Sequence, residues 1–394
     1  MALSTVRKIK ERLTARPAEL AAAREKGARV VSWLSYNIPE EVIYALGLVP
    51  VRLGTGGDDR LVEIGGRYIS TKNCVFVRET VGLFAEQKDP YIVNSDLVAF
   101  DATCLQLFRT AEVVQHYFGI NTLVLGVPRN FYWPEAGEYF RKELGHFVGR
   151  LEELAGTRLD RECLSAAIEL YKGIRGAIKE LYRYQAAIDA AIGWREVYDI
   201  VQAGFYLDRA EFLELLQELL AELAEKQGEP VIGHKFGEAR IFLSGSVIPP
   251  GDRKLIEIIE KHGGRIVGDD LWSGLAPYLD VEIGEPTVER VADAYLGRVP
   301  HAALPYLDLE TDGRLKNLKT LVKGFQAQGV INHTLRYCDP FTFKAGETKD
   351  ELKKEGVPML EIHTEYAGSD FEAIRTRVEA FVEMLRYLDY QESA

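Results

Sequence analysis

Residues 96–104 read Asp96–Leu–Val–Ala–Phe–Asp101–Ala–Thr–Cys104, and residues 329–339 read Gly329–Val–Ile–Asn–His–Thr–Leu–Arg–Tyr–Cys338–Asp339. Each stretch is a short apolar run that leads within a few residues to a cysteine. Short apolar runs between amphipathic helical segments are typical of strands in a parallel sheet. The carboxyl ends of such strands are where open α/β sheets bind ligands. Both stretches therefore predict an α/β fold with a cysteine at the ligand-binding edge of a sheet.

The segments around the two stretches repeat in the same order. Residues 29–34 and 239–243 are predicted strands, and each leads through a serine, Ser35 or Ser244, to a proline that precedes a helical pattern. A glycine and a further strand follow in both copies. Alternating strands and amphipathic helices indicate a parallel, doubly wound sheet. The repetition suggests a duplication, with the functional cleft between the two copies.

The segment between the copies has a different pattern. From Trp133 to about Lys226, apolar residues recur at helical spacing without intervening strands. We therefore predict an α/β protein with two similar doubly wound parallel-sheet domains, of the Rossmann or flavodoxin type, joined by a helical region. The predicted parts are an N-terminal helix (1–27), a first α/β domain (28–156), a helical connector (157–230) and a second α/β domain (231–394).

Composition excludes several classes of protein. A formal charge of −12 argues against nucleic acid or an anionic membrane as a partner. The sequence contains no run of 18 apolar residues, so we expect no transmembrane helix. The N-terminus lacks the apolar segment of a secretion signal. Four cysteines in 394 residues do not make a disulfide framework, so we expect a reducing, cytoplasmic setting. The sequence also lacks the glycine patterns of nicotinamide-binding and nucleotide-hydrolysing sites and the histidine spacing of zinc hydrolases.

The cysteines are candidate ligands of a metal cluster. Cys74, Cys104 and Cys338 lie at the ends of predicted elements, and thiolates that meet across a cleft suit a cluster better than a disulfide. Their spacing matches no compact motif, so the alternative is a set of buried thiols that act as small apolar side chains. That alternative is favoured for Cys163, which lies beside Leu164 in an amphipathic helix.

Three further residues are candidate catalytic groups. Ser35 lies between a strand and the helix that Pro39 begins, where a hydroxyl can cap the helix or bind a ligand. Glu40 and Glu41 follow in the first turn of that helix. A hydroxyl and a carboxylate near a cluster iron that lacks a protein ligand can transfer a proton. Carboxylates are, however, also common in the first turn of a helix, where they favour its dipole.

Several motifs resemble one family. The chain resembles the superfamily of 2-hydroxyacyl-CoA dehydratases and benzoyl-CoA reductases, and within it the D-component-like subunits of 2-hydroxyglutaryl-CoA dehydratase. The resemblance covers nearly the whole chain in the same order. The motifs that carry it are Leu34–Ser–Tyr–Asn–Ile–Pro–Glu–Glu–Val–Ile–Tyr–Ala–Leu–Gly–Leu–Val–Pro–Val51, Asn73–Cys74–Val–Phe–Val–Arg78, Ala102–Thr–Cys104, the stretch 329–339, and Arg375–Thr–Arg–Val–Glu–Ala–Phe–Val–Glu–Met–Leu385.

The resemblance implies an enzyme subunit with a [4Fe–4S] cluster held by Cys74, Cys104 and Cys338, one iron being free of a protein thiolate. It implies a homologous second subunit or a second copy, and a separate ATP-hydrolysing iron–sulfur activator. The implied reaction is radical elimination of water from a 2-hydroxyacyl-CoA thioester through a ketyl. Ser35 falls where the dehydratases place a serine near the substrate. Relatives with a double-cubane cluster need more cysteines than this chain has.

Two other functions remain open. The chain is alternatively the small cluster-bearing subunit of a benzoyl-CoA-type reductase, or a non-catalytic subunit that only relays electrons to its partner. A relay needs no room for a thioester beside the cluster, whereas both enzymes require a cavity there.

Overall fold

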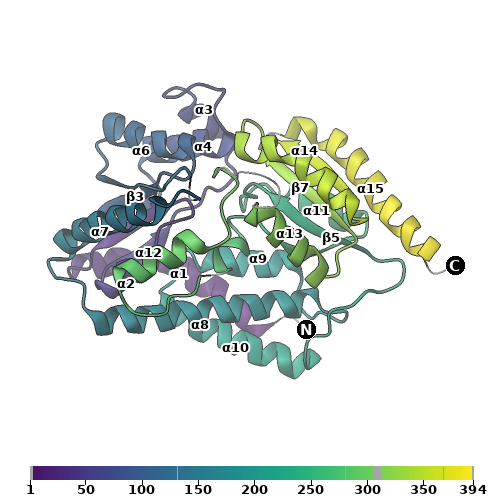
Figure 1. The fold of residues 1–394 in the computed structure, drawn as a ribbon, viewed down its shortest axis with the longest axis horizontal. Coiled ribbons are helices and arrows are strands. Elements are labelled where there is room, and N and C mark those ends of the chain that lie inside the picture. Colours follow the sequence, from purple (N-terminus) through teal and green to yellow (C-terminus); the bar gives the residue numbers. More distant parts are fainter. Residues whose placement is uncertain (1–2, 131, 280, 305–311, 367, 393–394) are drawn as a thin grey trace.

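Two four-stranded parallel sheets form the frame of the molecule in a computed structural model (Figure 1). The structure describes residues 3–130, 132–279, 281–304, 312–366 and 368–392. The first sheet has the order β2-β1-β3-β4 and the second β6-β5-β7-β8. The strands are β1 (Val30–Leu34), β2 (Val49–Arg52), β3 (Leu97–Asp101), β4 (Thr122–Leu125), β5 (Ala239–Gly245), β6 (Gly264–Asp269), β7 (Gly329–Leu335) and β8 (Met359–Thr364).

Helices cover both sheets and fill the region between them. They are α1 (Ser4–Glu25), α2 (Glu40–Ala45), α3 (Asp59–Gly65), α4 (Val75–Glu86), α5 (Pro90–Val93), α6 (Leu105–Phe118), α7 (Ala136–Ala155), α8 (Arg161–Ala186), α9 (Trp194–Ala203), α10 (Arg209–Gln227), α11 (Lys254–Lys261), α12 (Val288–Gly297), α13 (Gly313–Gly324), α14 (Asp339–Lys354) and α15 (Phe371–Glu392). Short 3₁₀ turns occur at Ala276–Tyr278 and Gly368–Asp370. Within the described part of the chain, none of the helices combines the length and apolar character that crossing a bilayer requires.

The sequence prediction of two similar parallel sheets is confirmed. All strand pairs are parallel, and both sheets have the same order of strands. Every residue of β1, β3, β5 and β7 is buried, as expected for central strands with helices on both faces. Alternate side chains of β1 divide between two cores: Val31 and Trp33 pack with α2 and α7, whereas Val30 and Leu34 pack with α4 and α6.

A central strand of each sheet ends at or just before a residue with a positive φ. Ser35 follows β1 with a φ of 93°, and Gly245 ends β5 with a φ of 118°. A Cβ on Gly245 would lie 1.9 Å from the carbonyl oxygen of His333, so only glycine fits there. Ser35 adopts a conformation that costs a non-glycine residue free energy, and such positions cluster at functional sites.

The helical connector shares its core with the second sheet. Helices α1 and α8–α10 contribute to one apolar cluster with β5, β6 and α15. Helix α8 runs along one side of the molecule beside α10 (Figure 1). Helix α12 instead packs on α7, against the first sheet, although it falls inside the predicted second domain. The two sheets are therefore linked both by the connector and by a crossing helix whose packing partner the sequence does not indicate.

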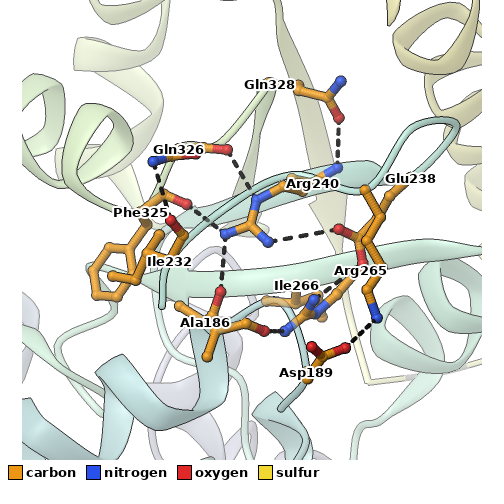
Figure 2. Close-up of polar contacts among 12 residues, drawn as sticks. Ala186, Asp189, Ile232, Glu238, Arg240, Arg265, Ile266, Phe325, Gln326 and Gln328 are labelled. Atoms are coloured by element: carbon orange, nitrogen blue, oxygen red, sulfur yellow. Dashed lines mark hydrogen bonds and ion pairs between the residues drawn. The ribbon is translucent and has the colours of Figure 1, made fainter. Parts of the chain in front are cut away.

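A fully buried arginine fastens the connector to the second sheet (Figure 2). Arg240, on β5, donates to the carbonyl oxygens of Ala186, Phe325 and Gln326 at 2.7–3.1 Å. Glu238 lies 3.6 Å from its Nη1 and also pairs with Arg265 at 3.1 Å. Burial lowers the pKa of Arg240 to about 10, which leaves it charged at neutral pH. The end of α8 is thus held to β5 through charge-assisted hydrogen bonds.

The buried carboxyl group of Asp269 should make the free energy of unfolding depend on pH. It accepts hydrogen bonds from Tyr182 Oη at 2.6 Å and Trp194 Nε1 at 2.8 Å, and burial raises its pKa to about 6. The folded state therefore holds this proton more tightly than the unfolded chain, where the pKa is about 4. Its contribution to stability is present below pH 4 and is lost as pH rises through about 6. We expect wild type to lose roughly 2–3 kcal/mol relative to Asp269→Asn between pH 4 and 7 in denaturant titrations; a constant difference would contradict this.

Candidate functional site

Three helix N-termini converge on one cavity, and each begins at a cysteine. Cys104 and Cys338 are each the third residue after a central strand, β3 or β7, and they precede α6 and α14. Cys74 precedes α4. The positive end of a helix dipole favours a negative charge, and a cysteine at this position is more readily ionised. The matched positions after β3 and β7 explain how two distant copies place thiols at one site.

The cavity has a volume of about 50 Å³ and a mainly apolar wall. The three thiols share it with a few polar side chains. Its lining consists of Ser35, Cys74, Phe76, Val77, Cys104, Gln106, Leu107, Ser246, Val247, Trp272, His301, Leu335, Cys338, Pro340 and Phe341. No carboxylate occurs among these described lining residues. We call this space the cysteine cavity.

The thiols interact with one another. A hydrogen bond from the Cys338 thiol lowers the pKa of Cys74, and the N–H groups of Phe76 and Val77 add to this effect. The same hydrogen bond and burial raise the pKa of Cys338 well above its usual value. Burial also raises the pKa of Cys104. Among the three thiols, Cys74 is therefore the one whose surroundings favour the thiolate.

The described residues do not hold a site for a single metal ion. No three of their His, Cys, Asp or Glu side chains converge on one ion-sized position.

Ser35 lies in the cysteine cavity and does not cap a helix. Its Oγ donates to Asp101 Oδ1 at 2.7 Å. Asp101 also accepts from the backbone N–H groups of Tyr36, Asn37 and Thr103 at 2.5–2.9 Å. Helix α2 begins after Pro39 without a side-chain cap. Asp101 thus joins the loop of Ser35 to the loop that leads to Cys104.

Glu40 and Glu41 lie away from the cysteine cavity. Glu40 binds Arg209 through both carboxylate oxygens, at 2.7 and 2.9 Å, and accepts from Trp33 Nε1 at 2.6 Å. Although burial opposes it, Arg209 holds the pKa of Glu40 below its usual value. Glu41 pairs with Arg175 at 2.6 Å and accepts from Tyr295 at 2.7 Å. The carboxylates that were expected beside the cysteines instead fasten α2 to the helical connector and to α12.

The Glu41–Arg175 pair predicts a large loss of stability when it is broken. Glu41 is fully buried, and the Arg175 side chain is 9% exposed. Glu41→Gln leaves an uncompensated buried guanidinium, so we expect a loss of about 3–5 kcal/mol in the free energy of unfolding. The control is Glu169→Gln, whose exposed pair with Lys172 is on the same helix as Arg175 and should contribute below about 0.5 kcal/mol. Equal effects of the two changes in urea denaturation would contradict the structural role of Glu41.

Comparison with known proteins matches residues 35–385 to one family, described as 2-hydroxyglutaryl-CoA dehydratase, D-component. The chain belongs to this family. The chain is similar to one of the subunits of benzoyl-CoA reductase from Thauera aromatica, at 24% identity over 91% of both chains. The beta subunit of (R)-2-hydroxyglutaryl-CoA dehydratase of Acidaminococcus fermentans is 22% identical over 98% of this chain and 100% of its own. The (R)-phenyllactyl-CoA dehydratase beta subunit of Clostridium sporogenes is 21% identical over 92% and 93% of the two chains.

The predicted resemblance is thus confirmed, and the chain is an enzyme subunit of the dehydratase and reductase type. The names of all three relatives describe them as subunits.

Two polar residues of the cysteine cavity, His301 and Gln106, belong to no sequence motif that predicts a role for them. His301 accepts from the N–H of Ala303 through Nδ1 at 3.1 Å, and burial lowers its pKa to about 3. The ring is therefore neutral, with its proton on Nε2. Gln106 accepts from the N–H of Cys74 at 2.7 Å and donates to the Tyr337 carbonyl at 3.1 Å. Gln106 thus joins the segment of Cys74 to the segment of Cys338. Its position two residues after Cys104 is the one sequence signal that points to it.

The fourth cysteine differs from its predicted environment. Cys163 is exposed rather than buried, because it lies in the first turn of α8, where its N–H binds the capping Asp160. It lies outside the cysteine cavity, as the prediction of no ligand role requires.

Proposed function

We propose that this chain is the [4Fe–4S] cluster-bearing subunit of a 2-hydroxyacyl-CoA dehydratase, with Cys74, Cys104 and Cys338 as the ligands. The observation that carries the proposal is the placement of three thiols at three helix N-termini around one cavity. A cluster with thiolate ligands is anionic, and helix N-termini together with a wall free of described carboxylates suit that charge. When bound, such a cluster supplies single-electron transfer.

Two polar side chains of the cavity are placed to bind a thioester substrate. Because Ser35 gives its proton to Asp101, its oxygen keeps lone pairs that can accept from the substrate hydroxyl. His301 has its proton on Nε2 and can donate to the thioester oxygen as negative charge develops there. Phe76, Trp272 and Phe341 provide the apolar wall that excludes water. The structure leaves Glu40 and Glu41 in ion pairs, so we assign them no proton transfer.

The chain needs other proteins for this reaction. Its sequence has no nucleotide-binding motif, whereas one-electron reduction of a thioester requires a strong driving force. We propose a homologous second subunit, or a second copy, and a separate ATP-hydrolysing iron–sulfur activator in the cytoplasm. The acyl-CoA substrate would bind within the complex of the two subunits.

Two observations favour other members of the same family. The match to a benzoyl-CoA reductase subunit supports a reductase as the second candidate. The mainly apolar wall of the cysteine cavity also suits an electron relay, which needs ligands for a cluster but no thioester beside it. The three candidates share the cluster and differ in what binds next to it.

Anaerobic reconstitution with the partner and activator separates these functions. For a dehydratase, 2-hydroxyacyl-CoA should be turned over with ATP and a reductant, and the substrate should change the electron paramagnetic resonance spectrum of the cluster in this chain. Turnover of an aromatic acyl-CoA alone would favour the reductase. Turnover without a spectral change at this cluster would favour the relay, and turnover by this chain without an ATPase would refute the proposal.

A further inference from the structure

A second cavity, of about 60 Å³, lies behind the Ser35 loop and is lined by Arg52, Arg175, Arg209 and Arg298. We call it the arginine cavity. Glu40 is the single acid among its described lining residues. The carbonyl oxygens of Ser35 and Trp272 accept from Arg52 at 3.3 and 2.6 Å, so this cavity backs on to two residues of the cysteine cavity.

Two of the four arginines have a carboxylate partner. Arg209 binds Glu40 with Nε and Nη2, and Arg175 binds Glu41 with Nη1. Four guanidinium groups against two carboxylates leave two positive charges, those of Arg52 and Arg298, without an acidic partner among the described residues.

Arg298 has two buried nitrogens without a hydrogen-bond partner among the described residues. It is 5% exposed, and its Nη1 donates to the Tyr36 carbonyl at 3.0 Å. Its Nε and Nη2 have no hydrogen-bond partner in the described part of the chain. Those two nitrogens form the same edge with which Arg209 holds both oxygens of Glu40. An oxyanion with two free oxygens matches that edge.

Arg52 is the second unpaired cation. It is 3% exposed, and only its Nη2 has hydrogen-bond partners, both carbonyl oxygens, in the described residues. The rings of Phe205, Trp33 and Trp272 lie 4.3–5.6 Å from its guanidinium carbon and offset part of the charge. Burial lowers the pKa of Arg52. Tyr278 and Glu40 partly oppose this effect, and the nearby charge of Arg298 adds to it.

The environment of Arg240 differs from that of Arg52 and Arg298. Arg240 is also fully buried, but Glu238 and three carbonyl oxygens surround it (Figure 2). Buried charges in proteins are normally paired, and two unpaired cations on one cavity are unfavourable without a counter-ion.

We propose that the arginine cavity binds a small oxyanion, such as phosphate or a carboxylate, between Arg52 and Arg298. The cavity, of about 60 Å³, has room for one such group. Because these arginines also hold the carbonyl oxygens of Ser35, Tyr36 and Trp272, the bound anion stabilises the loops next to the cysteine cavity. The proposal does not depend on which reaction the enzyme catalyses.

Thermal unfolding of the full chain tests this site. At constant ionic strength, replacing chloride by phosphate, sulfate or acetate should raise the melting temperature saturably for at least one of the three anions. Arg298→Gln should weaken the apparent affinity for that anion at least tenfold. Arg290→Gln, at an exposed position on the helix α12 that Arg298 follows, should leave it unchanged. An equal response to chloride, or full retention of the response in Arg298→Gln, would overturn the proposal.

A measurement on the unaltered protein covers the case in which Arg298→Gln does not fold. Crystals soaked in selenate should show an anomalous peak between Arg52 and Arg298, and the absence of a peak at saturating selenate would overturn the site. CoA then distinguishes the source of the anion: competition with phosphate identifies a phosphate group of CoA, and lack of competition identifies a free anion.

Discussion

Replacing Cys338 with alanine is expected to remove the iron from this protein. The anaerobically purified wild type should be brown and contain about four irons per chain, as a [4Fe–4S] site requires. Cys338 shares the cysteine cavity with Cys74 and Cys104, and its thiol hydrogen-bonds Cys74. Loss of one of three protein ligands leaves an iron without its thiolate, so iron content and turnover should both fall to background.

The chain contains its own control for this experiment. Cys163 is exposed and lies outside the cavity, so Cys163→Ala should keep full iron content and activity. Cys74→Ala and Cys104→Ala should behave like Cys338→Ala. Full iron loading of Cys338→Ala, with the expected absorption spectrum, would show that this residue is no ligand and would move the cluster elsewhere.

Ser35→Ala is expected to lower the rate of dehydration by about 10–100-fold, the equivalent of about 1–3 kcal/mol for a substrate hydroxyl left without its hydrogen-bond acceptor. The reason is that Ser35 combines a place in the cysteine cavity with a hydroxyl oriented by Asp101. The variant also loses a hydrogen bond to a carboxylate, which should destabilise the fold by roughly 1.5–3 kcal/mol. Turnover is measured in the reconstituted system, with iron content checked in parallel.

Ser35→Gly separates the hydroxyl from the backbone. Its φ of 93° suits glycine, so this variant should be more stable than Ser35→Ala by about 1 kcal/mol. Both variants lack the hydroxyl and should be equally slow if the hydroxyl acts on the substrate. Near-normal turnover in both would leave Ser35 as a residue that only shapes the loop, and would strengthen the electron-relay function.

The sequence by itself predicted the strands, the two similar sheets and the three cysteines that line one cavity. Apolar runs such as 97–101 and 329–335 are legible because central parallel strands are buried on both faces and need continuous apolar residues. The motifs around the cysteines were specific enough to indicate the family, which the match over residues 35–385 confirms.

The tertiary structure decided which side chains share a site. Glu40 and Glu41 are close to Ser35 in sequence, but the path of α2 places them toward Arg209 and Arg175, away from the cysteines. His301 and Arg298 lie on segments without periodicity, so only packing reveals that one borders the cysteine cavity and the other the arginine cavity. Local sequence determines an element and its buried face, whereas the neighbours of a polar side chain depend on contacts between residues hundreds of positions apart.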